Sequence, residues 1–314
     1  MNFSDKIKSE ILSKPIKEDH CKKAFIAGLI RGSGVLYERD GELGLEFKAF
    51  SEELALTLTT AFKTLFNYDI REVSVEEDKL NKKDKFYLNI FGDEAIEILK
   101  ELEVLIESDG DIAVNLKFYG EITKKECCLH AFIRGLFVSA GSCTLPTDND
   151  SSSTGYHLEI NFSHYSPAQE TAQKLAEYNI LTKIVKRREG YIVYIKSAEE
   201  IKDFIAFLPA PVSVLKITDL MVNREFANNI NRQKNCDLGN VNKQVEASAK
   251  HVAAIEKIEK TIGLDGLKDD LLNVAIARKE NPEETLLELA ERLGISKSCL
   301  NHRLRKIVLI ANEL

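Results

Sequence analysis

The sequence lacks any long run of apolar residues. A membrane-spanning helix needs about 20 consecutive, predominantly apolar residues, and no stretch of the 314-residue chain approaches that composition. Residues 1–14 fit a short amphipathic helix and have no apolar centre of the kind found in signal peptides. We therefore expect a cytoplasmic protein without a membrane partner.

Cysteine is scarce as well, with six in the chain and none in a CxxC pair. A long chain so poor in cysteine does not fit a disulfide framework, and free cysteine is readily buried, so we expect reduced, mostly buried thiols. Cys127 and Cys128 are adjacent, which is a poor arrangement for holding one metal ion, and the histidines share no metal-ligand spacing. We expect neither a metal nor a cofactor.

Motifs of several enzyme classes are missing too. The sequence contains no Walker-type phosphate loop, no GxGxxG and no Ser-His-Asp arrangement. It therefore gives no support for nucleotide hydrolysis, for dinucleotide chemistry or for a hydrolase of the triad type.

The net charge of −7 argues at first against nucleic-acid binding. Charge acts locally, however, so its distribution matters more than its sum. Acidic residues are concentrated in the first 125 residues, whereas the last 30 lean basic through Arg292, Lys297, Arg303, Arg305 and Lys306. An acidic body with a basic C-terminal end is compatible with DNA binding at that end.

An internal repeat organises the first two thirds of the chain. The stretch CKKAFIAGLIRGSG (residues 21–34) returns as CLHAFIRGLFVSAG (residues 128–141), with Cys, Ala, Phe, Ile, Gly, Leu and the final Gly at matching places. Each copy is followed by two strand patterns, a helical pattern, two further strand patterns and a closing helical pattern. This order predicts an α+β fold, a pseudo-twofold domain of two αββαββα repeats.

The repeats set the expected domain limits. We expect an N-terminal helix at 1–19, the two-repeat domain at 20–208 with copies at about 20–105 and 126–208, a helical Asn-rich linker at 209–260, and an all-α C-terminal domain at 261–314. Within the linker, the stretch Asp237–Asn242 predicts a break between two helices.

The repeated helix carries small residues four positions apart on one face. Such a row lets two helix backbones approach closely, where larger side chains would hold them apart. Interior glycine costs about 0.5–1 kcal/mol relative to alanine in a helix, so matching glycines in both copies favour a packing role over chance. The row consists of Ala24, Gly28 and Gly32 in the first copy and of Ala131, Gly135 and Ser139 in the second.

The stretch IAGLIRGSG (residues 26–34) resembles the LAGLIDADG motif of homing endonucleases. The resemblance implies two such helices packed at the domain centre, with the last acid of each motif binding a divalent metal ion. The matching positions hold Ser33 and Ala140, and the earlier Asp positions hold Arg31 and Val138. Cleavage of a phosphodiester needs carboxylates to hold the metal, so we expect a catalytically inactive domain with no metal there.

Residues 285–307 predict a helix-turn-helix independently of any family. An amphipathic first helix ends near Gly294, which suits a left-handed turn residue, and Ser296 can cap the second helix. The outward face of that helix has the chemistry to read a major groove, because Asn pairs with adenine and Arg with guanine. The alternative is an ordinary solvated helix face. The expected DNA-binding residues are Ser296, Lys297, Ser298, Asn301, His302, Arg303, Arg305 and Lys306.

The predicted linker is rich in asparagine, which lowers helix propensity without offering a core. Asn223, Arg224, Asn231 and Arg232 form a candidate surface for phosphate contacts or for intramolecular docking, and a plain solvated spacer is the alternative.

The whole arrangement resembles the WhiA family over residues from about 5 to 310, most specifically at residues 223–236 and 293–306. The resemblance implies a transcriptional regulator of cell division, chromosome segregation or sporulation that binds double-stranded DNA and is associated with the nucleoid. Two alternatives stay open. A protein-interaction scaffold would contact a sigma factor or division proteins, and an active nuclease would have to use Glu46 and Glu159, the acids at matching strand positions.

Overall fold

The computed structural model describes residues 2–78, 83–108, 110–146 and 155–314. The chain folds into two compact units, Met1–Val222 and Asn223–Leu314, which are described separately. No helix within the described ranges is both long enough and apolar enough to cross a membrane.

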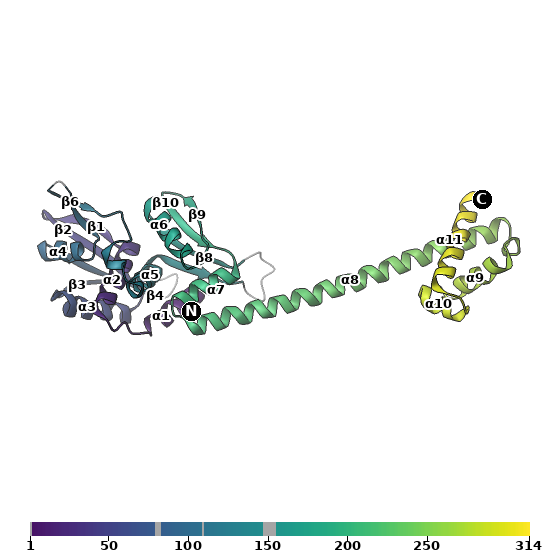
Figure 1. The fold of residues 1–314 in the computed structure, drawn as a ribbon, viewed down its shortest axis with the longest axis horizontal. Helices are drawn as coiled ribbons and strands as arrows, with labels where there is room; N and C mark the ends of the chain where they lie inside the picture. Colours follow the sequence, from purple (N-terminus) through teal and green to yellow (C-terminus); the bar gives the residue numbers. More distant parts are fainter. Residues whose placement is uncertain (1, 79–82, 109, 147–154) are drawn as a thin grey trace. The chain divides into compact units, whose positions relative to one another are not determined.

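The first unit contains two copies of one arrangement of helices and strands (Figure 1). The first copy comprises α2 (Asp19–Ser33), β1 (Val35–Arg39), β2 (Glu42–Ala49), α3 (Glu52–Phe66), β3 (Glu72–Asp78), β4 (Lys83–Phe91) and α4 (Asp93–Glu101). The second comprises α5 (Glu126–Ala140), β7 (Gly141–Thr144), β8 (His157–Phe162), α6 (Tyr165–Ala176), β9 (Lys183–Arg187), β10 (Gly190–Ile195) and α7 (Ala198–Phe207). The predicted pair of αββαββα repeats is therefore confirmed.

Each copy builds a four-stranded antiparallel sheet with the same strand order. The orders are β1-β2-β4-β3 and β7-β8-β10-β9, so corresponding strands occupy corresponding places. In the central strand β2, Leu45, Phe47 and Ala49 are buried. Alternate residues of a strand point to the same face, so this alternation directs one face of the sheet to the core.

Helices α2 and α5 lie side by side at the centre of the unit (Figure 1). Residues 24–30 of α2 are all buried, because the helix is enclosed on every side. A helix that is apolar around its whole circumference belongs in a core, and these two helices form the middle of it.

The N-terminal helix and the connection between the copies lie outside the repeats. The hairpin of β5 (Leu105–Ser108) and β6 (Asp111–Val114), followed by the short helix η1 (Glu121–Thr123), connects the copies and was not predicted. Helix α1 (Phe3–Leu12) is fixed to the second copy, since the Ser4 hydroxyl donates to the carbonyl of Cys143 at 2.8 Å and accepts from its N–H at 2.6 Å.

Helix α8 (Pro211–Thr261) is continuous, so the predicted break at Asp237–Asn242 is wrong. Asn and Gly only weaken a helix, by up to about 1 kcal/mol each, and this stretch contains no proline, the residue that would interrupt the hydrogen-bond ladder. The division between the units falls at residue 222, inside this helix. The domain limits expected from the sequence stay predictions.

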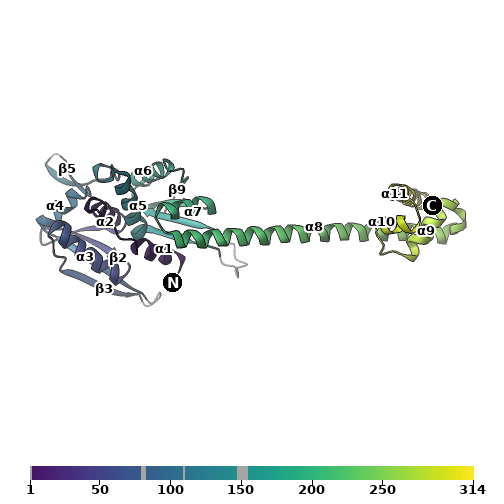
Figure 2. The same ribbon diagram turned by 60° about the horizontal axis from the view of Figure 1, so that its bottom comes forward.

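The second unit packs α9 (Asp269–Glu280), α10 (Leu286–Arg292) and α11 (Lys297–Glu313) against the last turns of α8 (Figure 2). The short helix η2 (Leu264–Gly266) precedes α9. The buried side chains of this core include Ile255, Ile258, Leu271, Val274, Leu289, Leu300, Leu304 and Ile307.

Candidate nucleic-acid interface

The second unit contains a helix-turn-helix formed by α10, a tight turn and α11. Thr285 caps α10 reciprocally: its hydroxyl accepts from the Glu288 N–H at 3.2 Å, and the Glu288 carboxylate accepts from the Thr285 N–H at 2.8 Å. Gly294 adopts a φ of +62° in the turn, a conformation that glycine reaches without strain. Ser296 then caps α11 by accepting from the Cys299 N–H at 3.2 Å. These local signals fix where both helices begin.

One side of α11 packs into the core of the second unit. Leu300, Leu304, Ile307 and Ala311 are buried, each at most 2% exposed. Successive residues of a helix are about 100° apart, so the opposite side centres on Ser298, His302 and Arg305. All three are exposed.

The eight residues predicted to bind DNA are not equally available. Asn301 and Arg303 flank the exposed face and are half-buried. Arg303 pairs with Asp270 of α9 at 3.7 Å, which draws its guanidinium toward the unit itself. The exposed members of the set are Ser296, Lys297, Ser298, His302, Arg305 and Lys306.

This face combines donors and acceptors in a way that suits nucleic acid. Lys297, Arg305 and Lys306 are cationic, and Asn301 and Ser298 offer neutral hydrogen-bonding groups. Cations neutralise phosphates, while amide and guanidinium groups read base edges in the major groove. The Ser296 hydroxyl already serves as the helix cap, so its first role is structural.

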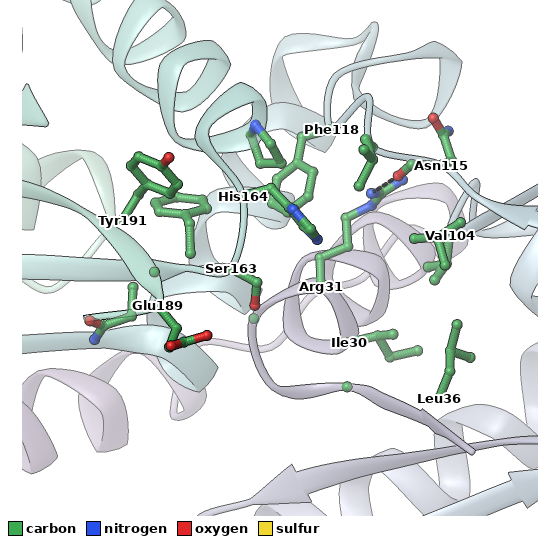
Figure 3. Close-up of a pocket in the computed structure, with 18 of the residues that line it drawn as sticks. Ile30, Arg31, Leu36, Val104, Asn115, Phe118, Ser163, His164, Glu189 and Tyr191 are labelled. Atoms are coloured by element: carbon green, nitrogen blue, oxygen red, sulfur yellow. Dashed lines mark hydrogen bonds between the residues drawn. The ribbon is translucent and has the colours of Figure 1, made fainter. Parts of the chain in front are cut away.

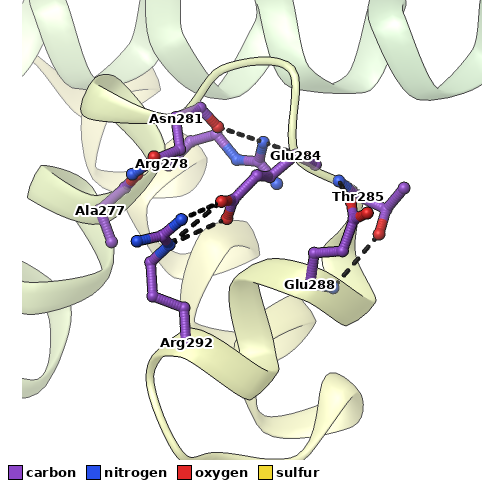
Figure 4. A network of polar contacts seen from close by, with 7 residues as sticks. All are labelled: Ala277, Arg278, Asn281, Glu284, Thr285, Glu288 and Arg292. Carbon is purple, nitrogen blue, oxygen red and sulfur yellow. Dashed lines mark hydrogen bonds and ion pairs between the residues drawn. The ribbon is translucent and has the colours of Figure 1, made fainter.

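A buried arginine that was not predicted from the sequence supports the helix-turn-helix (Figure 4). Arg278 of α9 is 1% exposed, and its guanidinium donates to the main-chain oxygens of Glu284 at 2.8 Å and Asn281 at 3.2 Å. It also reaches the Ser248 hydroxyl of α8 at 3.5 Å. One side chain thus holds the α9–α10 loop against α8. Burial lowers the pKa of Arg278, and the nearby Glu284 carboxylate offsets part of that shift.

Glu284 forms an ion pair with Arg292 at the end of α10 (Figure 4). The Arg292 Nε lies 3.1 Å from both carboxylate oxygens, and a terminal guanidinium nitrogen also contacts the carboxylate. The hydrogen bonds and charge of Arg292 lower the pKa of Glu284 below its ordinary value of 4.5. The pair therefore links the loop before α10 to its last turn.

In the first unit, the small residues of α2 and α5 lie where the two backbones meet. A Cβ on Gly28 would be 2.0 Å from the carbonyl oxygen of Phe132, and one on Gly135 would be 2.0 Å from that of Phe25. A Cβ on Gly32 would be 2.0 Å from the Ser139 hydroxyl. Ala24 and Ala131 are buried on the same helices. No larger side chain fits at Gly28 or Gly135 without moving a backbone.

The C-terminal ends of the two helices hold no carboxylate at the motif positions. Ser33 donates to the Leu29 carbonyl at 3.2 Å and accepts from the Lys48 N–H at 3.3 Å. Ala140 ends α5 with a methyl group that cannot bind a metal. A Cβ on Gly32 would lie 3.1 Å from the Ala140 Cβ, so the two ends are in contact.

The two earlier motif positions are structural as well. Val138 is buried at 1% exposure. Arg31 donates to the main-chain oxygens of Asn115, at 2.7 Å, and of Glu103, and its guanidinium lies 4.7 Å from the centre of the Phe118 ring. Burial lowers the pKa of Arg31 to about 10, although Glu103 and Glu170 counteract the shift.

A groove of about 750 Å³ lies beside this end of α2 (Figure 3). Figure 3 shows Arg31, Leu36 and Val104 on one side and His164 and Tyr191 on the other. Glu189 is the acid among the described residues that line the groove, and Arg187 and Arg188 line it too. A lining with a single carboxylate does not fit a two-carboxylate metal site.

The two acids considered for a displaced nuclease site lie on the central strands of the sheets. Glu46 is in register with Val35 and Asn89, and Glu159 with Ser142 and Tyr194. The Glu159 carboxylate is engaged, at 2.9 Å from His157 Nε2 and 3.9 Å from the Arg187 guanidinium. These partners compete with any metal ion for its oxygens.

The linker candidates lie on the central part of α8, within the second unit. Asn223, Asn231 and Arg232 are exposed, and Arg224 is half-buried. Apolar side chains accompany them on the surface, with Phe226 68% exposed. The helix therefore presents a mixed surface there.

Four potential metal ligands come together elsewhere in the first unit, at the first turns of α2 and α5. The ligand atoms of His20, Cys21, Cys127 and Cys128 all lie within 4.8 Å of one another. The cluster was not expected from the adjacent cysteines, because the repeat brings its ligands together from two helices. The six cysteines all lie within the described residues and none forms a disulfide, but only Cys21, Cys128 and Cys143 are buried, fewer than expected.

Both units match models of known protein families. Family models described as the WhiA N-terminal LAGLIDADG-like domain, the WhiA LAGLIDADG-like domain and the WhiA C-terminal HTH domain match residues 19–105, 129–227 and 230–311. The chain is 34% identical to the probable cell division protein WhiA of Caldicellulosiruptor saccharolyticus, over 100% of the chain and 96% of the relative. It is 33% identical to the protein of the same name in Bacillus subtilis, over 100% and 97%.

A solved structure extends this likeness to the fold. The crystal structure of full-length WhiA from Thermatoga maritima is 25% identical and matches with a TM-score of 0.59, covering 100% of this chain and 99% of that one. The paired LAGLIDADG-like repeats, the C-terminal helix-turn-helix and the similarity over the full length agree, and the chain belongs to the WhiA family.

Proposed function

We propose that this protein is a transcriptional regulator that binds double-stranded DNA through α11. The observation that carries the proposal is the exposed row of Ser298, His302 and Arg305 on a helix whose opposite side is locked into a core. A helix-turn-helix presents its second helix to the major groove in this way. Lys297 and Lys306 add phosphate-neutralising charge beside the row.

The names of its relatives support a proposal for the process it serves. Those compared above are named as probable cell division proteins, and we propose a role for this chain in cell division, with chromosome segregation and sporulation as related programmes. Such a regulator would act in the cytoplasm, at the nucleoid.

The LAGLIDADG-like domain serves as a scaffold in this proposal, not as an enzyme. Ser33 and Ala140 stand where a cleaving enzyme needs metal-binding acids. The side chain of Glu159 is paired with His157 and Arg187. The domain would then position a protein or contact DNA only weakly.

The test is fluorescence-anisotropy binding of the full chain to promoter-rich genomic fragments over a series of salt concentrations. Asn301→Ala/Arg305→Ala should lose sequence-specific binding, because each bidentate base contact contributes about 1–3 kcal/mol of discrimination. Lys306→Ala should instead weaken binding to all sequences and lower the salt dependence by about one phosphate contact.

Arg187→Ala is the matched control, since it removes an exposed arginine from the first unit. It should leave specific binding by α11 unchanged. If the Asn301/Arg305 variant keeps specific binding while Arg187→Ala loses it, the first unit recognises the DNA sequence and the proposal is wrong.

A second candidate is a protein-interaction scaffold for a sigma factor or a division protein. It is favoured by the apolar side chains exposed on α8 next to Asn231 and Arg232, among them Phe226, Leu238 and Val241. This reading expects Phe226→Ser to abolish function in the cell while the Asn301/Arg305 variant stays functional. Asn223 and Arg224 would belong to the same surface.

A further inference from the structure

The cluster of thiols and imidazole follows the pseudo-twofold symmetry of the first unit. Asp19 begins α2 and Glu126 begins α5, and the next two residues of each helix are the potential ligands. Cys21 and Cys128 hold equivalent places in the repeat, and His20 is matched by Cys127. The two helices that meet at Gly28 and Gly135 thus also meet at their first turns.

The distances fit one tetrahedral ion. His20 Nδ1 lies 3.2 Å from the Sγ of Cys128 and 3.2 Å from the Sγ of Cys21. Bonds of about 2.3 Å to sulfur and 2.0–2.1 Å to nitrogen make the edges of a zinc tetrahedron about 3.4–3.8 Å. The four ligand atoms span at most 4.8 Å, so rotamer adjustments of a few tenths of an ångström to about 1 Å would close the site.

The charges in such a site would balance closely. A divalent cation would bind the cysteines as thiolates, because a coordinated thiol loses its proton. Three thiolates and a neutral imidazole around a doubly charged ion leave one negative charge, which the N-terminal ends of two helices stabilise.

We propose that His20, Cys21, Cys127 and Cys128 bind one zinc ion that joins the first turns of α2 and α5. The donor set selects the metal, because sulfur and imidazole favour zinc over magnesium or calcium, which prefer oxygen ligands. All four tetrahedral positions are filled by protein groups, which marks a structural site without an open position for a substrate. The ion would tie together two helices that belong to different copies of the repeat.

Two of the ligands can be changed without disturbing the core. His20 and Cys127 are exposed, whereas Cys21 and Cys128 are buried. His20→Ala and Cys127→Ser therefore test metal binding in a chain that folds. Cys236→Ser, at an exposed cysteine outside the cluster, is the matched control, and Cys143→Ser controls for loss of a buried thiol.

The experiment measures zinc content and cobalt binding in the full chain purified under reducing conditions. We expect one zinc per chain and, on replacement by Co²⁺, the thiolate-to-cobalt charge-transfer band and the strong visible bands of tetrahedral cobalt. His20→Ala and Cys127→Ser should weaken zinc binding by more than about 100-fold, beyond what loss of an outer-shell partner causes. Circular dichroism checks that each variant is folded, and both controls should bind as the unchanged chain does.

Three outcomes overturn the proposal. One is a reduced, folded chain that neither contains zinc nor develops the cobalt spectrum. Another is equal zinc affinity in His20→Ala, Cys127→Ser and Cys236→Ser. The third is a Cys21–Cys128 disulfide found by mass spectrometry in chain isolated from cells with thiols blocked at lysis, since it would identify a redox pair. None of these results depends on whether α11 binds DNA.

Discussion

Arg278 donates a 2.8 Å hydrogen bond to the main-chain oxygen of Glu284, across the loop that leads into the helix-turn-helix. The guanidinium is almost wholly buried, and it also donates to the main-chain oxygen of Asn281 at 3.2 Å. The stability of the second unit therefore depends on a buried residue of α9 that lies outside the exposed face of α11.

Replacing Arg278 by methionine keeps the volume of the side chain but leaves these oxygens without their donor. We expect a loss of about 3 kcal/mol from the second unit, as when one partner of a buried polar network is removed. Hydrogen–deuterium exchange of the full chain should show faster exchange in α9, α10 and α11 and no change in α2 or α5. Protection of the three helices equal to that of the unchanged chain would refute this role.

The Glu284–Arg292 pair gives the second unit a defined response to acid. The pKa of Glu284 is lower in the folded chain than its ordinary 4.5, chiefly because Arg292 donates hydrogen bonds to it. The pair therefore contributes stability that is fully present above about pH 4.5 and is lost as the pH falls through the folded pKa.

Carboxylate titration by NMR should show this depressed pKa directly. Arg292→Gln should move the pKa of Glu284 back toward 4.5 and remove its share of the acid dependence. Glu280→Gln, at a nearby carboxylate that is not part of the pair, serves as the control and should leave the Glu284 titration in place. A Glu284 pKa unaffected by the Arg292 change would contradict the assignment.

The contact between α2 and α5 should not tolerate a single added methyl group. A Cβ at Gly28 or Gly135 would stand 2.0 Å from a main-chain carbonyl oxygen, so the helices must separate. We expect Gly28→Ala and Gly135→Ala each to lower the free energy of unfolding by about 3 kcal/mol, the upper end for overpacking. Chemical denaturation measures this loss, and hydrogen–deuterium exchange in α2 and α5 locates it.

Gly239→Ala is the control for the effect of glycine itself. Gly239 is also helical, but a Cβ there would meet no atom within 4 Å. It should be neutral or stabilising by up to about 1 kcal/mol. If all three substitutions behaved alike, close packing at Gly28 and Gly135 would not be the cause.

The chain should leave DNA intact in the presence of divalent metal ions. Supercoiled plasmid incubated with the full chain and Mg²⁺ or Mn²⁺ is expected to stay supercoiled, because the helix ends at Ser33 and Ala140 offer no carboxylate. Cleavage by the unchanged chain that disappears in Glu46→Gln/Glu159→Gln would reverse this conclusion and indicate a displaced active site.

Most of the fold could be predicted because the same order of elements occurs twice in the sequence. The copies that begin at Cys21 and Cys128 support each other, since a strand or helix pattern that is weak in one copy is confirmed by its counterpart in the other. The β5–β6 hairpin occurs once and had no second copy to reveal it. The break expected at Asp237–Asn242 failed because local propensity is weak beside the cooperativity of a long helix.

The candidate site was predictable only where it has a sequence signature. Gly294 predicts a turn and Ser296 predicts a helix cap, and the start of α11 that they indicate agrees with the structure. Arg278 has no such signature, because its partners are mainly backbone oxygens, which every residue carries. The cluster of His20, Cys21, Cys127 and Cys128 was missed for a related reason, since its spacing is a property of two packed helices and not of the chain.

The reciprocal contact of Gly28 and Gly135 also constrains how the two halves of the gene can change. Each glycine faces a main-chain oxygen of the other copy, so no substitution in the partner can make room for a side chain. A mutation at either glycine has no compensating mutation opposite it. The copies can diverge on their surfaces, but at this crossing point both positions have to remain glycine.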